Sequence, residues 1–402
     1  MSKGSILVIG GGQNQCGLIR AARKYGAQVI VTDINSNPPG RKLADVFVSI
    51  DTKDKEANLE VAKRHAISGV VTDQTDAAVP TAAYVAESLG LPGIGYELAV
   101  RFTNKFVMRH YLKGRLAANI PDFHYFEHPG QADDWMSSIP NVSQWIVKPH
   151  TAQGSKGVSR LLKTTAQSQV WDAFRESNFS GILIESYIEG KEFSVEAFVE
   201  QGETHNLAVT VKEHYPENPC IDRRNLYLGN VSHEIERKLY QLNTDVIRHL
   251  GLEQGPTHAE YMVTNDGKVY LMEIAARGGG GNISEKLIPY LTDFKPTEGI
   301  LRFSTGAQNE MMYRNYRERF AVMRFVDLPH GDYSPVRLPE FNQDWFLHFD
   351  LDLDRVFEAR PVRNSADRLG YFIIRGETAK ESLSRESQVM QKLQAAASGA
   401  RK

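Results

Sequence analysis

Short runs of β-branched and aliphatic residues alternate with amphipathic stretches through the first hundred residues. The expected strands are residues 6–9, 28–32, 46–50 and 69–72, and the expected helices are residues 18–25, 55–65 and 77–89. Strands that are separated by helices and short links favour a parallel sheet with helices on both faces. The alternation therefore predicts an α/β fold that begins with a doubly wound parallel sheet.

The glycines after the first expected strand allow three interpretations. Glycines at 10–12, with Asp33 at the end of the second strand, suggest a dinucleotide-binding turn, but the G-x-G-x-x-G fingerprint would need a glycine at Gln15. The segment can also be a tight turn between strand and helix. In the third interpretation it lines a substrate cleft at the carboxyl edge of the sheet. The candidate substrate contacts in this part of the chain are then Gly11, Asp73 and Asp76.

A turn-rich segment at residues 91–95 marks the end of the first domain. Further strands are expected at residues 145–147, 182–185, 193–199 and 206–211, followed by a hairpin at 258–275. Past residue 300 the pattern is mixed, with strand character at 321–326 and 371–375. We therefore divide the chain into residues 1–95, 96–300 and 301–402.

Composition narrows the class of protein. The 402 residues, 41% of them hydrophobic, can bury the cores of two or three domains. A formal net charge of -2 argues against a nucleic-acid-binding surface. The two cysteines form no C-x-x-C pair, which argues against a cysteine zinc site and favours a reducing, cytoplasmic setting. No apolar run approaches the roughly 20 residues of a membrane span.

The expected hairpin places two carboxylates opposite each other. An Asp-Gly pair at 266–267 between alternating runs is a strong hairpin signal, and if these are the two turn residues, Glu260 pairs with Glu273. Cross-strand Cβ atoms lie about 5 Å apart, so like charges there are unfavourable unless a cation lies between them. Two carboxylates beside nucleotide phosphates are a natural site for Mg²⁺ or Mn²⁺. The alternative is that both side chains are solvated and spread apart.

An arginine and a glycine run follow the second carboxylate. Arg277 lies four residues beyond Glu273 and precedes the four glycines at 278–281. A guanidinium beside a metal site can hold phosphoryl or carboxylate oxygens with two hydrogen bonds. The glycines, Gly279 and Gly280 among them, can bring backbone N–H groups close to an anion. We expect this segment to contact substrate.

Lysines and a second glycine-containing segment supply candidate phosphate contacts. Lys148 ends the strand expected at 145–147, and in the loop 150–158 that follows, glycines flank Ser155 and Lys156. Mobility, backbone donors and a positive charge suit a loop that closes over phosphates, although the spacing is not that of a P-loop. Residues 185–192 lead from an apolar strand into a polar linker, where a backbone edge could bind adenine.

Together and in this order, these elements resemble the ATP-grasp superfamily. They are Asn104-Lys105, Val147-Lys148-Pro149, the loop ending Gly154-Ser155-Lys156-Gly157, the segment 185–192, and finally Glu260, Glu273 and Arg277. The chain is similar to carbamoyl-phosphate-synthetase-like proteins and L-amino acid ligases over roughly residues 5–300. The resemblance implies a Rossmann-like pre-ATP-grasp domain, a two-lobed α+β ATP-grasp domain with the nucleotide and metal site, and a C-terminal α+β portion that completes the substrate cleft.

The resemblance also implies a role for each residue. Adenine would be held by Glu185 and the backbone of Ser186 and Ile188, and the ribose by Glu192. The candidate phosphate contacts are Lys105, Lys148, Lys212 and, in the closing loop, Ser155, Lys156 and Gly157. Glu260 and Glu273 would bind magnesium. Arg277 would stabilise an acyl phosphate and a tetrahedral intermediate, and Lys148 is the second catalytic candidate.

Two positions depart from the common pattern of the superfamily. Ala275 stands where many relatives carry an asparagine ligand, although amino acid ligases often lack it and keep the Glu-x-x-x-Arg spacing found here. Asn282 is a candidate for the missing ligand. His258 stands where some relatives have an arginine that contacts phosphate or substrate, so it is a further candidate substrate contact.

The implied reaction is ATP-dependent ligation of a small-molecule carboxylate to an amine through an acyl phosphate. The alternatives are a bicarbonate-activating enzyme, a ribonucleotide synthetase of purine biosynthesis, and a nucleotide- or NAD-binding protein without turnover. No second ATP-grasp half, biotin-bearing domain or ribose-phosphate site is recognisable. The two substrates, the pathway and a homodimer are left open. Arg302, Arg324 and His330 could meet a substrate carboxylate, but a solvated or structural role is the simpler interpretation of each.

Overall fold

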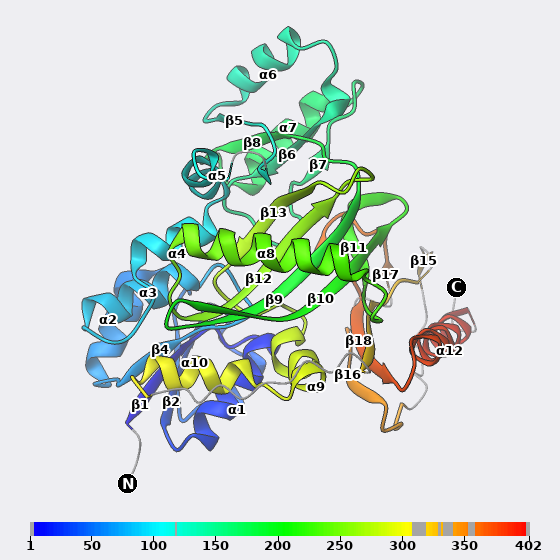
Figure 1. Cartoon of the computed structure of the whole chain (residues 1–402). Coiled ribbons are helices and arrows are strands. Elements are labelled where there is room, and N and C mark those ends of the chain that lie inside the picture. The colour runs from blue at the N-terminus through cyan, green and yellow to red at the C-terminus, as the bar shows by residue number, and fades with distance from the viewer. Residues whose placement is uncertain are drawn as a thin grey trace.

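The computed structural model describes residues 4–116, 119–307, 319–328, 331–332, 341–352 and 358–398. Figure 1 shows one large sheet between an N-terminal α/β unit and a small lobe that projects from the opposite end, with α12 beside the C-terminal strands of the sheet. In the described part of the chain, no helix combines the length and the apolar character that a membrane crossing needs. His330 lies outside the described residues.

The N-terminal unit is a parallel sheet with the strand order β3-β2-β1-β4. Its elements are β1 (Ser5–Ile9), α1 (Cys16–Lys24), β2 (Gln28–Asp33), β3 (Val46–Ser49), α2 (Lys55–Arg64), β4 (Gly69–Val71) and α3 (Val79–Ser88). Ile6 and Val8 are buried in one core with α1, while Leu7 and Ile9 are buried on the opposite face, in a second core that includes residues of α2 and α3. Burial on both faces explains the continuous apolar runs. The predicted doubly wound parallel sheet is confirmed.

The small lobe is a four-stranded sheet with the order β5-β8-β6-β7 and two packed helices. Its elements are β5 (Phe123–Phe126), α6 (Pro129–Ser138), β6 (Trp145–Pro149), β7 (Ser159–Arg160), α7 (Ala166–Glu176) and β8 (Ile182–Ser186). Its core draws only on residues between Phe126 and Ile184. The helices α4 (Tyr96–Thr103) and α5 (Lys105–Lys113) connect it to the N-terminal unit.

The large sheet has eight strands in the order β13-β12-β9-β10-β11-β14-β18-β16. They are β9 (Lys191–Glu200), β10 (Glu203–Tyr215), β11 (Asn218–Tyr227), β12 (Gly255–Val263), β13 (Val269–Ala275), β14 (Phe320–Phe325), β16 (Phe346–Leu351) and β18 (Gly370–Gly376). A two-stranded pair, β15 (Gly331–Asp332) and β17 (Glu358–Ala359), lies beside it. The predicted strands at 321–326 and 371–375 therefore extend the same sheet across the proposed boundary at residue 300.

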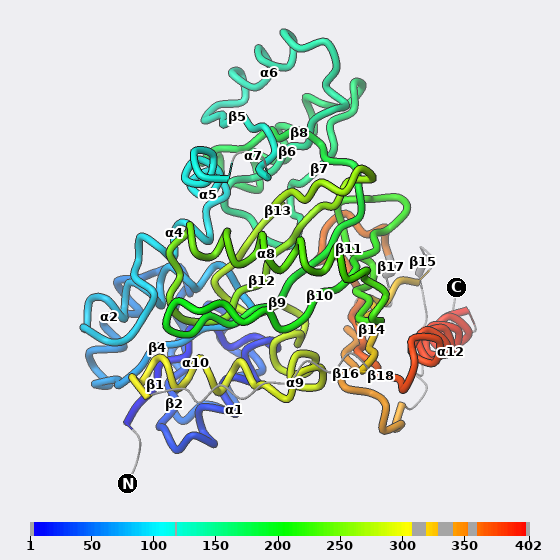
Figure 2. Tube along the Cα trace, viewed as in Figure 1, coloured from blue at the N-terminus to red at the C-terminus, as the bar shows by residue number. Residues whose placement is uncertain are grey.

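Helices cover both faces of the large sheet. α8 (His233–Leu250) packs on one face, where Leu239, Val246 and Leu250 join the apolar residues of β9, β12 and β13. On the other face, α9 (Ile288–Thr292) and α10 (Pro296–Ser304) lie between the large sheet and the N-terminal unit, as the tube in Figure 2 shows. α12 (Ala379–Ser398) packs against β14 and β18.

The hairpin of β12 and β13 reaches the predicted pairing by a different route. Its loop has three residues rather than two, because Thr264 N–H donates to the carbonyl of Lys268 at 2.9 Å and Gly267 adopts a φ of 78°. This loop shifts the register by one residue. A bulge then leaves Met272 extra between the pairs Tyr261–Leu271 and Glu260–Glu273. The assignment of a two-residue turn is wrong, and the opposition of Glu260 and Glu273 is confirmed.

Candidate active site

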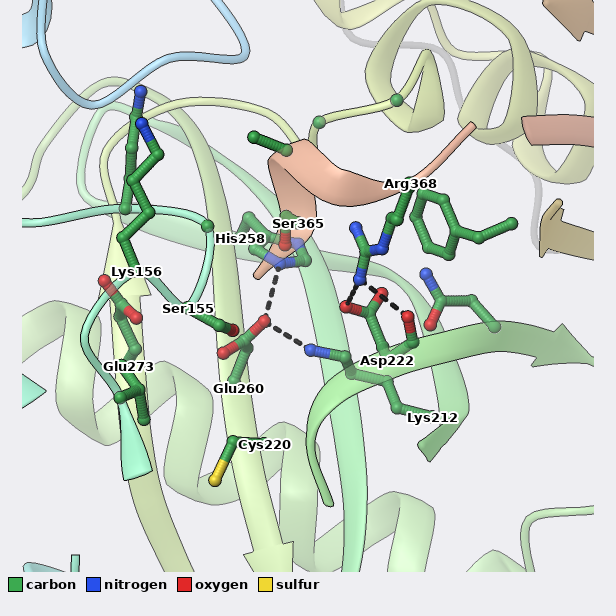
Figure 3. A pocket seen from close by; sticks show the side chains of 18 of the residues that line it. Ser155, Lys156, Lys212, Cys220, Asp222, His258, Glu260, Glu273, Ser365 and Arg368 are labelled. Carbon is green, nitrogen blue, oxygen red and sulfur yellow. Dashed lines mark hydrogen bonds and ion pairs between the residues drawn. The ribbon is translucent and has the colours of Figure 1, made fainter. Parts of the chain in front are cut away.

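A cavity of about 950 Å³ lies where the N-terminal unit, the small lobe and the large sheet meet. Figure 3 shows side chains from the β-strands, from the loop after β6 and from the C-terminal segment converging on it. Glu192 of β9, Lys212 of β10, and His258 and Glu260 of β12 line it. Because side chains alternate along a strand, residues two apart such as His258 and Glu260 point to the same face of the sheet.

Two cations hold Glu260 in place. Lys212 Nζ lies 2.5 Å and His258 Nε2 3.5 Å from Oε1 of Glu260. Burial opposes ionisation of this carboxyl, but the charges of Lys212 and His258 hold its pKa well below the usual range. Lys212 Nζ also contacts Glu192 Oε1 at 2.7 Å, and Glu192 Oε2 lies 2.8 Å from His214 Nε2.

His258 lies between two glutamates. Its Nδ1 forms a short hydrogen bond with Glu196 on the neighbouring strand β9, and its Nε2 faces Glu260. Burial disfavours a charged imidazole, but Glu196 outweighs it and raises the pKa of His258 to about 9.

Glu273, the second predicted metal ligand, is paired with Lys105. The Lys105 Nζ donates to Glu273 Oε1 at 2.7 Å and to the carbonyl of Ala152 at 2.9 Å. Lys105 is the first residue of α5, whose N-terminus is capped by the Asn104 side chain. Burial lowers the pKa of Lys105, but the Glu273 carboxylate outweighs it, so that its pKa is raised. Directly opposite glutamates are thus tolerated because each has its own cation.

Arg277 is held from the N-terminal unit. Its Nε and Nη2 donate to the two carboxylate oxygens of Asp76 at 3.0 and 2.9 Å, and its Nη1 donates to the carbonyl of Gly278 at 3.1 Å. Both side chains line the cavity. Gly280 also lines the cavity, whereas the N–H of Gly279 donates to Glu196 Oε2 at 3.2 Å.

The loop after β6 borders the cavity with Ser155 and Lys156. Gly154, Ser155 and Gly157 have positive φ values of 69°, 55° and 66°. Gly157 packs against Pro149 and α7, where an added Cβ would meet backbone at 3.1 Å. Lys156 is exposed. The backbone of this loop turns sharply beside the cavity, which suits a segment that folds over a ligand.

Comparison with known proteins bears on what this cavity is. Residues 142–286 match the ATP-grasp domain family. The chain contains an ATP-grasp domain. Dapdiamide A synthase of Enterobacter agglomerans is 26% identical over 197 residues, which are 46% of this chain and 45% of that protein. An L-arginine-specific L-amino acid ligase of Bacillus subtilis is 23% identical over 60% of each chain. The chain thus matches about half the length of the curated relatives.

Solved structures extend the likeness to the whole chain at the level of the fold. An L-amino acid ligase from Bacillus licheniformis has a TM-score of 0.76 and 20% identity over 98% of both chains. A phosphoribosylglycinamide synthetase from Anaerococcus prevotii has a TM-score of 0.71 and 19% identity over 97% of this chain and 98% of that one. The expected fold class, a parallel-sheet domain followed by a two-lobed ATP-grasp fold and a C-terminal α+β portion, is confirmed.

Within the ATP-grasp domain, Glu185 has two cations of the protein as partners, and its contact with adenine stays a prediction. Its side chain is fully buried, and its two oxygens lie 2.8 Å from Arg109 Nε and from Lys148 Nζ. Burial opposes ionisation, yet the charges of Arg109 and Lys148 lower the pKa of Glu185 to about 2. This geometry does not favour a direct contact with adenine. Glu185 instead fixes Lys148, which lines the cavity.

Several other predicted contacts are already engaged within the protein. Ser186 N–H donates to the carbonyl of Asp122 at 2.8 Å, which leaves Ile188, at the cavity wall, as the better adenine candidate. Asn282 donates to Tyr371 Oη at 2.7 Å and lies 3.2 Å from His348 Nε2, contacts with β18 and β16 rather than with the glutamates. Its metal role stays a prediction that these contacts do not favour.

Two of the candidate substrate contacts in the N-terminal unit, Gly11 and Asp73, are buried and have structural partners. Gly11 N–H donates to Asp33 Oδ2 at 2.7 Å, so the acid that suggested dinucleotide binding closes its own turn. Asp73 is fully buried and accepts from Gly278 N–H at 2.8 Å and from Ser284 Oγ at 2.9 Å. Neither Gly11 nor Asp73 is among the residues that line the cavity. Arg324 is likewise structural, since it is buried and pairs with Asp327.

Arg109 and Glu196 are the residues that sequence reasoning missed. Arg109 is fully buried and links Glu185 to the carbonyl of Met272 in β13, at 2.6 Å. No motif marks Arg109 within its helix or Glu196 within its strand. Only the spacing Glu192-x-x-x-Glu196 along a strand, which places both carboxylates on one face, could have indicated the second.

Proposed function

We propose that the chain is an ATP-dependent ligase that joins a small-molecule carboxylate to an amine through an acyl phosphate. The observation that carries the proposal is the convergence of Glu260, Glu273 and Arg277 with three lysines on one cavity. The lysines are Lys105, Lys148 and Lys212. A metal-binding acid pair beside cations is what phosphoryl transfer needs, because catalysis there is positioning and charge stabilisation.

The donor set fits a magnesium ion that is shared with a nucleotide. Carboxylate oxygens suit a hard cation. In the described part of the chain, no three His, Cys, Asp or Glu side chains gather as a complete metal site, so phosphate oxygens and water would supply the other ligands. Glu260 and Glu273 would hold the ion. When bound, the magnesium ion would neutralise part of the negative charge of the phosphates.

The side chains of this protein act mainly by forming ion pairs with negatively charged groups of the nucleotide and the substrate. We propose that Lys105 and Lys212 exchange their glutamate partners for phosphate oxygens when the nucleotide binds, and that the loop 150–158 covers them. An oxygen of the substrate carboxylate then attacks the γ-phosphorus, and the bond to ADP breaks. The amine nitrogen attacks the acyl carbon, inorganic phosphate leaves with the C–O electron pair, and the amine loses a proton. Arg277 holds the developing oxyanions.

A substrate screen tests the proposal. The purified chain would be supplied with ATP, Mg²⁺ and pooled carboxylates and amines, including amino acids and sugar acids, and ADP and phosphate release would be followed. We expect release that requires both a carboxylate and an amine, with an amide identified by mass spectrometry. Release that requires bicarbonate or phosphoribosylamine instead would support the alternatives. Nucleotide binding without release under any condition would overturn the proposal.

A further inference from the structure

The loop after β4 reaches across the cavity to the glycine-rich segment after β13. The carboxylate of Asp76 receives two hydrogen bonds from Arg277. Three residues earlier, Asp73 accepts from Gly278 N–H at 2.8 Å, and between them Gln74 Oε1 accepts from the N–H of Asn282 at 2.9 Å. Residues that lie some two hundred positions apart in the sequence are thus fastened at both ends of the glycine run.

The pairing with Asp76 fixes the Arg277 guanidinium without occupying all of its N–H donors. Both side chains are only 14% exposed, so the two hydrogen bonds are protected from competing water. A guanidinium has five N–H donors. Nε and Nη2 each donate one hydrogen bond to Asp76, and Nη1 donates one to the Gly278 carbonyl. Two N–H groups of the guanidinium remain. The two hydrogen bonds to Asp76 fix the plane of the guanidinium and so the direction of these N–H groups.

Asp76 also contacts the loop after β6, which borders the cavity. Its backbone N–H donates to Gln153 Oε1 at 3.0 Å. The carbonyl of the preceding residue, Ala152, accepts from Lys105, which is the partner of Glu273. One residue of the N-terminal unit therefore touches both the arginine and the closing loop of the ATP-grasp domain.

We propose that Asp76 is a positioning residue for the ligation reaction. It orients Arg277 by one edge so that the two remaining N–H groups meet the oxyanion of the substrate carboxylate as it is phosphorylated and attacked. The proposal rests on the proposed function and adds to it that the N-terminal unit completes the active site. Asp76 itself does not contact the substrate.

Kinetics separate this role from general damage to the fold. Asp76→Asn keeps the shape of the side chain and removes its charge, and we expect kcat to fall on the order of 100-fold while KM for ATP stays within about twofold. Thr75→Ala is the matched control, because the Thr75 side chain forms no hydrogen bond with the described residues. When Arg277→Ala is already present, adding Asp76→Asn should not lower kcat any further.

Additive losses in the double variant, or a parallel loss of ATP affinity, would overturn the positioning role. An increase in activity would overturn it too, because Asp76 would then compete with the substrate. A readout that needs no turnover is the exchange of the Arg277 Nε–H with solvent, observed by NMR and assigned from Arg277→Lys. We expect protection in the native protein and its loss in Asp76→Asn. Unchanged protection contradicts the pairing even if the chain proves to be no ligase.

Discussion

The acidic side chains nearest the proposed nucleotide site each have a cation as partner. Glu260 pairs with Lys212, Glu273 with Lys105, and Asp76 with Arg277. Burying a carboxylate is costly unless it is paired, and these contacts supply a partner charge for each acid before any ligand arrives. The same lysines are the groups that a triphosphate would attract. At the scale of single residues, the site is therefore assembled in advance, and binding exchanges partners rather than creating charge.

Removing one acid of the pair should abolish turnover. We expect Glu273→Ala to lower kcat at least about 100-fold, because a ligand of the metal is lost. Lys105 also loses its partner at 9% exposure, so Glu273→Gln, which can still accept a hydrogen bond, should be equally inactive but better folded. Glu253→Ala, at an exposed position, is the control. Normal ADP release by either Glu273 variant would exclude the metal role.

The buried trio of Arg109, Glu185 and Lys148 should make the small lobe sensitive to acid. Glu185→Gln leaves two cations without a charged partner, which we expect to cost about 3–5 kcal/mol of unfolding free energy at neutral pH. The folded pKa of Glu185 is depressed to about 2, so this advantage of the native protein is full above about pH 4.5 and is lost as the pH falls toward 2.

Tryptophan fluorescence in urea can measure this difference, since Trp135, Trp145 and Trp171 lie in the small lobe and only Trp345 lies elsewhere. The difference between the urea concentrations at the unfolding midpoints of the native protein and of Glu185→Gln should become smaller as the pH is lowered. A gap that stays constant from pH 7 to pH 3 would show that the carboxylate charge is not what stabilises the lobe.

The β12–β13 hairpin is the element that brings the two metal candidates together, and its loop depends on Gly267. This residue has a φ of 78°, and an added Cβ would meet only the flexible end of Lys238 at 3.5 Å. Gly267→Ala should therefore lose about 1–2 kcal/mol of unfolding free energy through backbone strain alone. Gly130→Ala in α6, where φ is not positive and space is open, should be neutral or stabilising. Equal effects of the two substitutions on thermal unfolding would contradict this explanation.

The hairpin also shows how far sequence patterns lead. Alternation and a turn signal were enough to predict that Glu260 faces Glu273, but not that a three-residue loop and a bulge at Met272 cancel each other. The parallel sheet was predictable because each strand is a local apolar run. The ion pair of Glu185 with Arg109 was not predictable, because the two residues lie 76 positions apart and no local pattern marks a buried ion pair. Gly11 and Asp73 look like cleft residues in sequence, yet tertiary contacts occupy them.

At the scale of the whole molecule, the three units are joined unequally. The N-terminal sheet shares one apolar core with the large sheet, in which Ile6 and Val8 occur together with Phe198 and Leu301. The small lobe has a core of its own. Its links to the rest near the cavity are polar, such as the ion pair of Glu185 with Arg109 of α5. Since apolar burial is the main stabilising term between packed units, the small lobe is the part expected to move when a nucleotide binds.

Closure of the small lobe over a nucleotide should protect Lys156 from trypsin. Lys156 is exposed in a sharply turned loop at the cavity, and Lys163, exposed in the same lobe but away from the cavity, provides an internal control. If cleavage requires the open form, Mg·ATP at about 100 times its Kd should slow cleavage after Lys156 by up to about 100-fold. Peptide mapping at early times would measure both sites. Equal protection of both lysines would indicate general stabilisation, and cleavage after Lys156 at an unchanged rate would mean that the loop does not close over the nucleotide.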